Sequence, residues 1–226
     1  MPSRISIIGS SHIAKESIEK VEKEIETFSP DIVALELDSK RAYALMQKKE
    51  PKKASAKEII RSVGFKGYVI ASIGSFTQKK LGDTVGVKPG SEMKKALLVA
   101  KKKGIRIEYI DQDIEVTLRK FANALTWREK WRFFKDIAFA PFSKDKNMKF
   151  DLSKVPEEKI IKELLKEVKV RYPSIYNVLV AERNAIMAKR LFRLSRKFPE
   201  AKILAVVGAG HREEILAILK KLEKEN

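Results

Sequence analysis

Two histidines are the residues of this sequence whose surroundings most strongly indicate chemistry. Each of the two histidines of the chain ends a Gly-x-x-His motif, Gly9-Ser-Ser-His12 and Gly208-Ala-Gly-His211. Each motif follows an apolar run and precedes a helical pattern, so we expect both imidazoles at the carboxyl edge of a parallel sheet, where ligands bind. A helix N-terminus favours the neutral imidazole that metal coordination needs. The alternative is that each motif is only a polar turn that caps a helix.

Buried carboxylates are the second feature. Glu36 lies within the apolar segment 32–37, and an isolated buried charge costs many kcal/mol, so it needs a cation. A metal ion or an arginine from a later helix can supply that charge. Glu92 falls in the first turn of a predicted helix, where the dipole favours a carboxylate whatever its role. The chain has no cysteine, so any metal is held by nitrogen and oxygen.

Arg183 offers a permanently charged fork for a substrate carboxylate or a developing oxyanion. The alternative to this role is that Arg183 forms an ion pair with Asp111 or Asp113, which follow the third predicted strand. Five polar residues are predicted to support the site or to contact substrate: Ser11, Asp38, Asp111, Asp113 and Asn184.

Four short apolar segments are predicted to form the strands that position these residues. They span 5–8, 31–37, 105–110 and 201–207, and the third alternates apolar with polar residues, so one of its faces should be less buried. Helices are predicted over 13–28, 40–48, 92–103 and 212–225. We expect the first two strands to be parallel neighbours joined by a right-handed crossover. The predicted class is α/β, with a mostly parallel central sheet flanked by helices.

A largely helical insertion, from about 115 to 196, is predicted between the third and the last strand. We expect one domain over 1–226 that includes it. Within the insertion, residues 121–142 interleave aromatic and basic side chains, and Trp127, Trp131 and Phe134 fall at helical spacing. Packing in the core is the favoured interpretation, and a lid over substrate, a lipid or base contact and a dimer interface are the others.

The charge balance bears on the partners. The net charge is +18, from 48 Lys and Arg against 30 Asp and Glu. A charge of this size makes nucleic acid or an anionic membrane surface a candidate binding partner. Both signs are interleaved on the predicted helices, as on a heat-adapted surface, so nucleic acid is not expected. No segment approaches the ~18 apolar residues of a membrane span. With no signal-peptide pattern we expect a cytoplasmic chain, and a homodimer or a peripheral membrane contact stays open.

Six ordered motifs resemble the TraB family, which is related to PrgY-type pheromone-shutdown, GumN and Tiki proteins and more distantly to erythromycin esterases. They are Ile-Ile-Gly-Ser-Ser-His12, Pro30-Asp-Ile-Val-Ala-Leu-Glu36, Pro89-Gly-Ser-Glu92-Met, Ile110-Asp-Gln-Asp113-Ile, Ala181-Glu-Arg183-Asn and Val207-Gly-Ala-Gly-His211. The resemblance implies a site made by two Gly-x-x-His motifs with an intervening glutamate and arginine, and Tiki-type members are understood as metal-dependent proteases. Many archaeal-type relatives continue into C-terminal membrane helices. We therefore expect either a short soluble member or a chain without that anchor.

Residues and resemblance together predict a metal-dependent hydrolase that acts on peptide or other amide bonds. His12, Glu36 and His211 are the predicted ligands of a divalent ion, for which Mn, Co, Zn and Fe are equally suitable. Glu92 is predicted to move protons and Arg183 to stabilise negative charge on oxygen. The alternative, which the resemblance to pheromone-shutdown proteins suggests, is a non-catalytic protein that binds or sequesters a peptide or small ligand.

Overall fold

A parallel sheet forms the centre of the molecule. The computed structural model describes residues 4–10, 15–47, 55, 57–62, 64, 90–124, 126–129, 131–132, 135 and 158–225. In this part of the chain the strands are β1 (Ile5–Ser10), β2 (Ile32–Leu35), β3 (Arg106–Tyr109) and β4 (Ile203–Gly208), in the order β1-β4-β2-β3. All three pairings are parallel, which confirms the predicted α/β class.

The position of β4 corrects the expectation that the first two strands are neighbours. The last strand lies between β1 and β2 and pairs with both. All six residues of β4 are buried, whereas β1 has half-buried positions and β3 is exposed at both ends. All four residues of β2 are buried as well, so the two strands that are apolar on both faces take the two interior positions, which cover both faces and both edges. This order also makes β1 and β4, which are far apart in the sequence, neighbours in the sheet.

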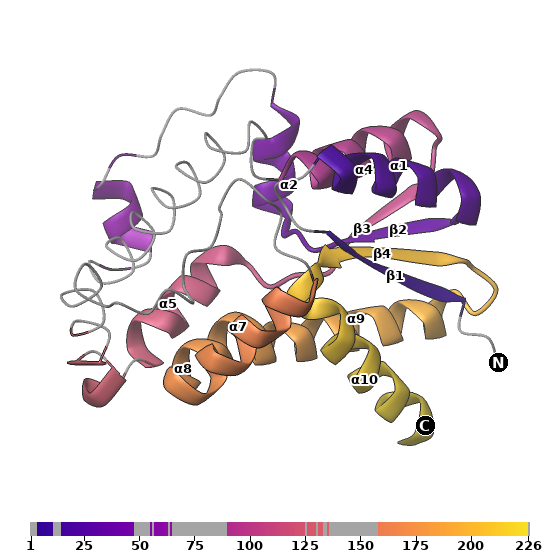
Figure 1. Ribbon diagram of the computed structural model, residues 1–226. Helices are drawn as coiled ribbons and strands as arrows, with labels where there is room; N and C mark the ends of the chain where they lie inside the picture. The colour runs from indigo at the N-terminus through magenta and orange to yellow at the C-terminus, as the bar shows by residue number, and fades with distance from the viewer. Residues whose placement is uncertain are drawn as a thin grey trace.

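Helices cover both faces of the sheet (Figure 1). Helices α1 (Lys15–Phe28) and α4 (Ser91–Lys102) lie on one face, and α9 (Glu182–Lys197) and α10 (Ala209–Glu225) lie on the other. Side chains of each strand alternate between the two cores, so that Leu204 and Val206 pack with α1 and α4 while Ala205 and Val207 pack with α9 and α10. Helix α2 (Ser39–Met46) follows the carboxyl end of β2.

The described residues of the segment between β3 and β4 are mostly helical, as predicted. It contains α5 (Ile114–Ala124), α7 (Glu158–Arg171), α8 (Pro173–Tyr176) and a π-helical turn, η3 (Asn177–Ala181), that leads into α9. Trp127 and Trp131 are 75% and 59% exposed, so the core interpretation is wrong for these two residues: their face of the helical segment is turned to the outside. Phe134 lies outside the described residues. No helix in the described ranges is long and apolar enough to cross a membrane.

The alternation of side chains along β2 places Glu36 on the face of the sheet that α9 and α10 cover. Ile32 and Ala34 pack into the core on that face, and Glu36 follows with the same parity. The backbone of Glu36 still bonds to β4, through the Val206 carbonyl at 3.0 Å. A carboxylate is thereby held at the carboxyl edge of the sheet, next to the end of β4.

Gly9 lets the start of α10 approach the end of β1 closely. A Cβ atom added to Gly9 would lie 3.0 Å from the Cα atom of Ala209, a backbone atom that cannot move alone. The two Gly-x-x-His motifs therefore contact each other where Gly9 approaches Ala209.

We predict that Gly9→Ala destabilises the protein by about 1–3 kcal/mol, because the added methyl group overpacks the contact with Ala209. Thermal unfolding followed by circular dichroism measures this as a lower midpoint. Ser6→Ala, at a half-buried position of the same strand, is the control and should change the midpoint little. An unchanged midpoint for Gly9→Ala would show that the contact is not tight.

Candidate functional site

Glu36 and Gly208 join β2 to the end of β4. The Glu36 Oε2 atom accepts a hydrogen bond from the backbone N–H of Gly208 at 2.6 Å. Its Oε1 atom accepts from Nη2 of Arg183 and lies 3.3 Å from Nε2 of His211. The side chain of Glu36 is 6% exposed and that of His211 is 13% exposed. Buried carboxylate, imidazole and guanidinium thus meet at one point.

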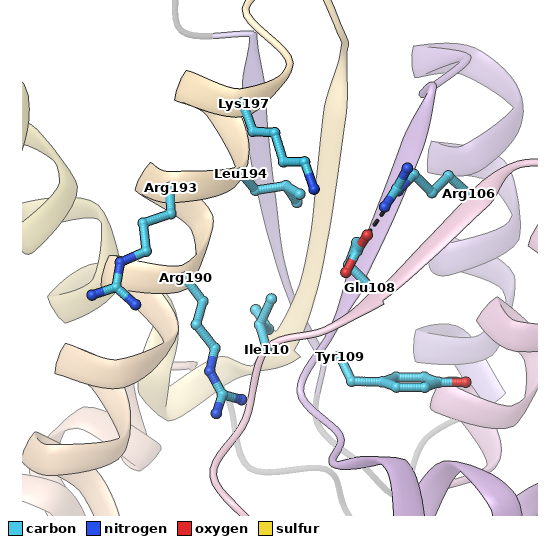
Figure 2. Close-up of a pocket in the computed structure, with 8 residues that line it drawn as sticks. All are labelled: Arg106, Glu108, Tyr109, Ile110, Arg190, Arg193, Leu194 and Lys197. Carbon is cyan, nitrogen blue, oxygen red and sulfur yellow. Dashed lines mark hydrogen bonds and ion pairs between the residues drawn. The ribbon is translucent and has the colours of Figure 1, made fainter.

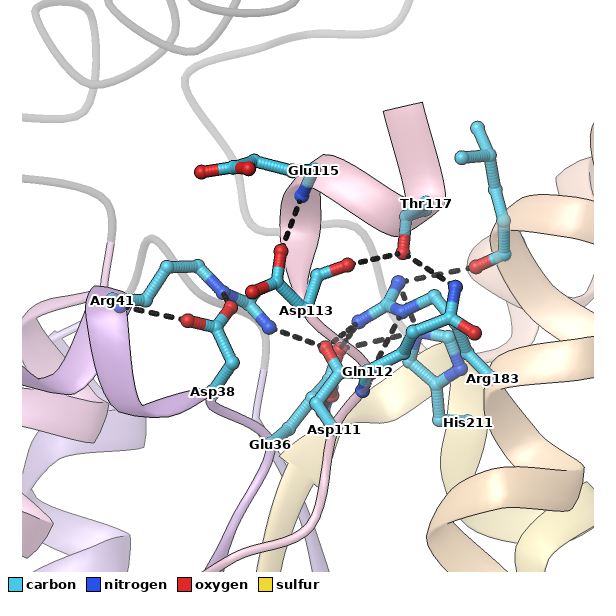
Figure 3. Close-up of polar contacts among 12 residues, drawn as sticks. Glu36, Asp38, Arg41, Asp111, Gln112, Asp113, Glu115, Thr117, Arg183 and His211 are labelled. Atoms are coloured by element: carbon cyan, nitrogen blue, oxygen red, sulfur yellow. Dashed lines mark hydrogen bonds and ion pairs between the residues drawn. The ribbon is translucent and has the colours of Figure 1, made fainter. Parts of the chain in front are cut away.

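Arg183 is the centre of this network (Figure 3). Its Nε and Nη2 atoms donate to the two carboxylate oxygens of Asp111 at 3.0 and 2.6 Å, a bidentate pair. Its Nη1 atom donates to the Leu179 carbonyl at 3.1 Å, within the π-helical turn η3. Burial alone would lower the pKa of Arg183, but its hydrogen bonds and charge contacts with Asp111 and Glu36 raise that pKa above its ordinary value. Arg183 is therefore permanently charged.

Asp111 receives a second guanidinium. Nη2 of Arg41 donates to its Oδ2 atom, and Nε of Arg41 donates to Asp38 Oδ2 at 2.6 Å. Asp38 also caps α2, where its Oδ1 atom accepts from the Arg41 N–H at 2.9 Å. Burial would raise the pKa of Asp111, but the hydrogen bonds and positive charges of Arg183 and Arg41 hold it below its ordinary value.

A hydrogen-bonded chain orients the imidazole of His211. Glu214 Oε2 accepts from the Asn184 side-chain nitrogen at 2.7 Å and from the Tyr176 hydroxyl at 3.0 Å. Because a carboxylate only accepts, the amide oxygen of Asn184 must face Nδ1 of His211, which lies 2.6 Å away. Nδ1 therefore carries a proton. In the neutral ring the lone pair is then on Nε2, which faces Glu36 and lies 3.5 Å from Nη1 of Arg183.

Comparison with known proteins places this chain in a family. A sequence profile of the TraB/PrgY/gumN family matches residues 2–226. The chain belongs to the TraB/PrgY/gumN family. It is 44% identical over 225 residues to the uncharacterized protein MJ1365 of Methanocaldococcus jannaschii, and the alignment covers 98% of this chain and 55% of that protein. It is 23% identical over 233 residues to the human TraB domain-containing protein, covering 92% of this chain and 61% of that protein. The chain thus spans somewhat more than half the length of these TraB relatives.

The structure brings together most of the polar residues that were predicted for a TraB site. Glu36, Asp111, Arg183, Asn184 and His211 form one network, and Asp38 joins it through a second arginine. Two ion pairs were weighed as alternatives, one to a metal ion beside Glu36 and one to a substrate-binding role of Arg183. Both are observed, because Arg183 pairs with Glu36 and with Asp111. In addition, His211 lies inside the first turn of α10 and not before the helix as predicted, because the helix already begins at Ala209.

The other predicted TraB residues are Asp113, Glu92, Ser11 and His12. Asp113 accepts the Glu115 N–H at 2.7 Å and lies 3.2 Å from Nζ of Lys40, so it caps α5 at the surface. Glu92 is buried in the first turn of α4, whose N-terminus points to the carboxyl edge because α4 leads back to β3. Ser11 and His12 lie outside the described residues. In the described part of the chain no three His, Cys, Asp or Glu side chains are grouped as a metal ion would need.

Sequence reasoning missed three members of the network, and two of them carried a signal. Glu214 follows His211 by three residues, and Arg41 follows Asp38 by three, a spacing that puts both members of each pair on one helix face. Tyr176, by contrast, reaches Glu214 across two elements, and nothing in the sequence indicated that contact.

We predict that Asp111→Asn destabilises the protein by about 3–5 kcal/mol, because Arg183 and Arg41 lose their shared carboxylate in a buried setting. The folded-state pKa of Asp111 is lowered, so its contribution is present above the unfolded pKa of about 3.9 and is lost as the pH falls below that value. Chemical denaturation across acid pH measures both effects. Asp113→Asn, which keeps a capping oxygen at the surface, is the control and should cost less than about 1 kcal/mol.

We further predict that Glu214→Leu changes the tautomer of His211. Without its acceptor the Asn184 amide is free to turn its nitrogen toward Nδ1, and the ring proton then moves to Nε2. Nitrogen-15 NMR resolves this, since the chain has only two histidines and His12→Gln assigns them. Glu214→Gln retains an oxygen acceptor and should keep the original tautomer. An Nδ1–H signal that persists in Glu214→Leu would contradict the proposed chain of hydrogen bonds.

Proposed function

We propose that this TraB-family protein is a metal-dependent hydrolase of peptide or other amide bonds. The site at the carboxyl edge of the sheet would bind the ion through His211, Glu36 and His12. The proposal rests above all on one contact, between His211 Nε2 and Glu36 Oε1.

Two hydrogen-bond acceptors face each other in that contact. Asn184 fixes the proton of His211 on Nδ1, so the lone pair of a neutral ring on Nε2 points toward a carboxylate oxygen 3.3 Å away. The guanidinium of Arg183 lies beside both atoms, because its Nη2 atom donates to Glu36 Oε1 and its Nη1 atom lies 3.5 Å from His211 Nε2. A second proton on His211 or a metal cation would place a further positive charge between the two atoms, and these two states are separable by experiment.

The separation of the two atoms fits a metal ion. Two ligands about 2.1 Å from one ion, at angles between octahedral and tetrahedral, are about 3.0–3.4 Å apart, and the observed 3.3 Å falls in that range. The Glu214–Asn184–His211 chain is also the kind of support that orients a metal-binding imidazole. His12, the third proposed ligand, ends the motif next to this edge.

Arg183 keeps one donor for a substrate. Of its five N–H groups, those on Nε and Nη2 are used by Asp111 and Glu36, and one on Nη1 is used by the Leu179 carbonyl. The remaining N–H lies beside His211 Nε2, at a separation too long for a strong hydrogen bond. A carbonyl oxygen placed there would receive a charged donor as negative charge develops on it.

Each component has a defined role in the proposed reaction. A bound divalent ion would lower the pKa of a water molecule and polarise the substrate carbonyl. Glu36 and His211 would fix the position of the ion, and Arg183 would stabilise the oxyanion. The buried carboxylate of Glu92 would accept and return the proton.

We predict stoichiometric binding of a divalent metal that is lost in His211→Ala and Glu36→Gln. Calorimetric titration of chelator-treated protein with Mn, Co and Zn measures affinity, and the visible spectrum of the cobalt form reports the ligands. Loss of a residue that only supports a ligand typically costs ~10–100-fold, so loss of a ligand should cost more than about 100-fold. Asp113→Asn is the control and should retain wild-type affinity.

Hydrolysis is tested separately, by mass spectrometry of a peptide mixture incubated with and without metal. Metal-dependent cleavage that Arg183→Gln slows by about 100- to 1000-fold is the expected result. Full cleavage by metal-free protein would contradict the metal role. Saturable binding with every peptide recovered intact would contradict hydrolysis and favour sequestration.

A further inference from the structure

A hollow between α9 and the edge strand β3 carries an unbalanced positive charge (Figure 2). Its volume is about 280 Å³, and its lining includes Arg190, Arg193 and Lys197 of α9 and Arg106 and Glu108 of β3. We call it the α9–β3 pocket. Ile110 also lines it, whereas Glu36 and His211 do not.

The cations of α9 are not matched by nearby carboxylates. Arg190, Arg193 and Lys197 are three and four residues apart and so lie on one helix face. The sequence has no Asp or Glu between Glu182 and Glu200. In the described part of the chain neither Arg193 nor Lys197 forms an ion pair, whereas other surface lysines pair within 3.0 Å, for example Lys95 with Glu22 and Lys120 with Glu182.

Neighbouring groups hold several of these cations in place. The guanidinium of Arg106 lies 4.7 Å from the centre of the Phe198 ring, and Nζ of Lys197 lies 5.4 Å from it, so one ring orients cations from both sides of the pocket. Arg190 donates to the backbone carbonyl of Asp111, which leaves its charge uncompensated. Arg106 is paired with Glu108, at 2.7 Å. Side chains that are already ordered lose less entropy when a ligand binds.

We propose that the α9–β3 pocket binds the phosphate groups of a small phosphorylated molecule. A guanidinium group can donate two parallel hydrogen bonds to two oxygens of one phosphate. Four cations against one carboxylate leave a surplus of positive charge that suits a multivalent anion. The volume is near the lower end of small-molecule pockets, which begin at ~300 Å³, and fits a diphosphate. Figure 2 shows the Tyr109 ring directed away from the cations, so the pocket offers no stacking platform for a nucleic-acid base.

The test is calorimetric titration of the full chain with inorganic diphosphate and with ATP, without metal and at low ionic strength. The double variant Arg193→Gln/Lys197→Gln removes two cations of the pocket. Lys189→Gln/Arg196→Gln removes two exposed cations of the same helix that do not line the pocket, so both variants lose the same net charge. Arg190 is left unchanged because it contacts Asp111.

One-site binding by the wild type and by the control, with at least tenfold weaker binding in the pocket variant, is the expected result. Equal affinity for diphosphate and ATP would identify the phosphate chain as the recognised group. Equal weakening in both double variants would overturn the proposal and favour diffuse attraction to a basic surface. Absence of binding in the wild type would also overturn the proposal. Thermal unfolding of each variant verifies the fold. The result is independent of metal binding at His211.

Discussion

The pairing of Arg183 with Asp111 and Glu36 is the interaction on which the rest of the site depends. Two carboxylates from the ends of two strands are buried together, and such charges are tolerated in an interior only with compensating partners. Arg183 bonds to both through separate N–H groups and so connects β2 and β3 to α9. His211 then occupies the side of Glu36 that the guanidinium leaves accessible. The position of the imidazole is therefore a consequence of how the buried charges are neutralised.

The strand order brings the ends of β1 and β4 next to this arrangement. Because β4 lies between β1 and β2, the end of β4 is adjacent to the end of β1 and to Glu36. Gly208 contributes its N–H to Glu36, and Gly9 allows α10 to begin close to β1. Two glycines of the repeated motif thus act through a hydrogen bond and a close backbone contact, whereas the histidines are the proposed metal ligands. The family resemblance over nearly the whole chain is consistent with a site that needs both ends.

The sequence predicted the strands, the class and most of the site because these depend on local patterns. Apolar runs that end in Gly, Glu or Asp marked the carboxyl edge. The strand order was not predictable in that way, since β2 and β4 are both fully buried and their positions depend on long-range pairing. Long-range contacts such as that between Tyr176 and Glu214 depend on how the helices pack. The exposure of Trp127 and Trp131 was missed for the same reason: helical spacing identifies a face but not what covers it.

The charge balance of the site argues for a cation near His211. The carboxylates of its described part are Glu36, Asp38, Asp111 and Glu214, and the guanidiniums that pair with them are Arg41 and Arg183. With a neutral imidazole these groups carry two net negative charges. A proton on Nε2 of His211 would leave one net negative charge, whereas a divalent ion would make the site neutral. A neutral site repels a developing oxyanion less than a negative one does, which is why the protonation of His211 and the proposed hydrolysis are two aspects of one question.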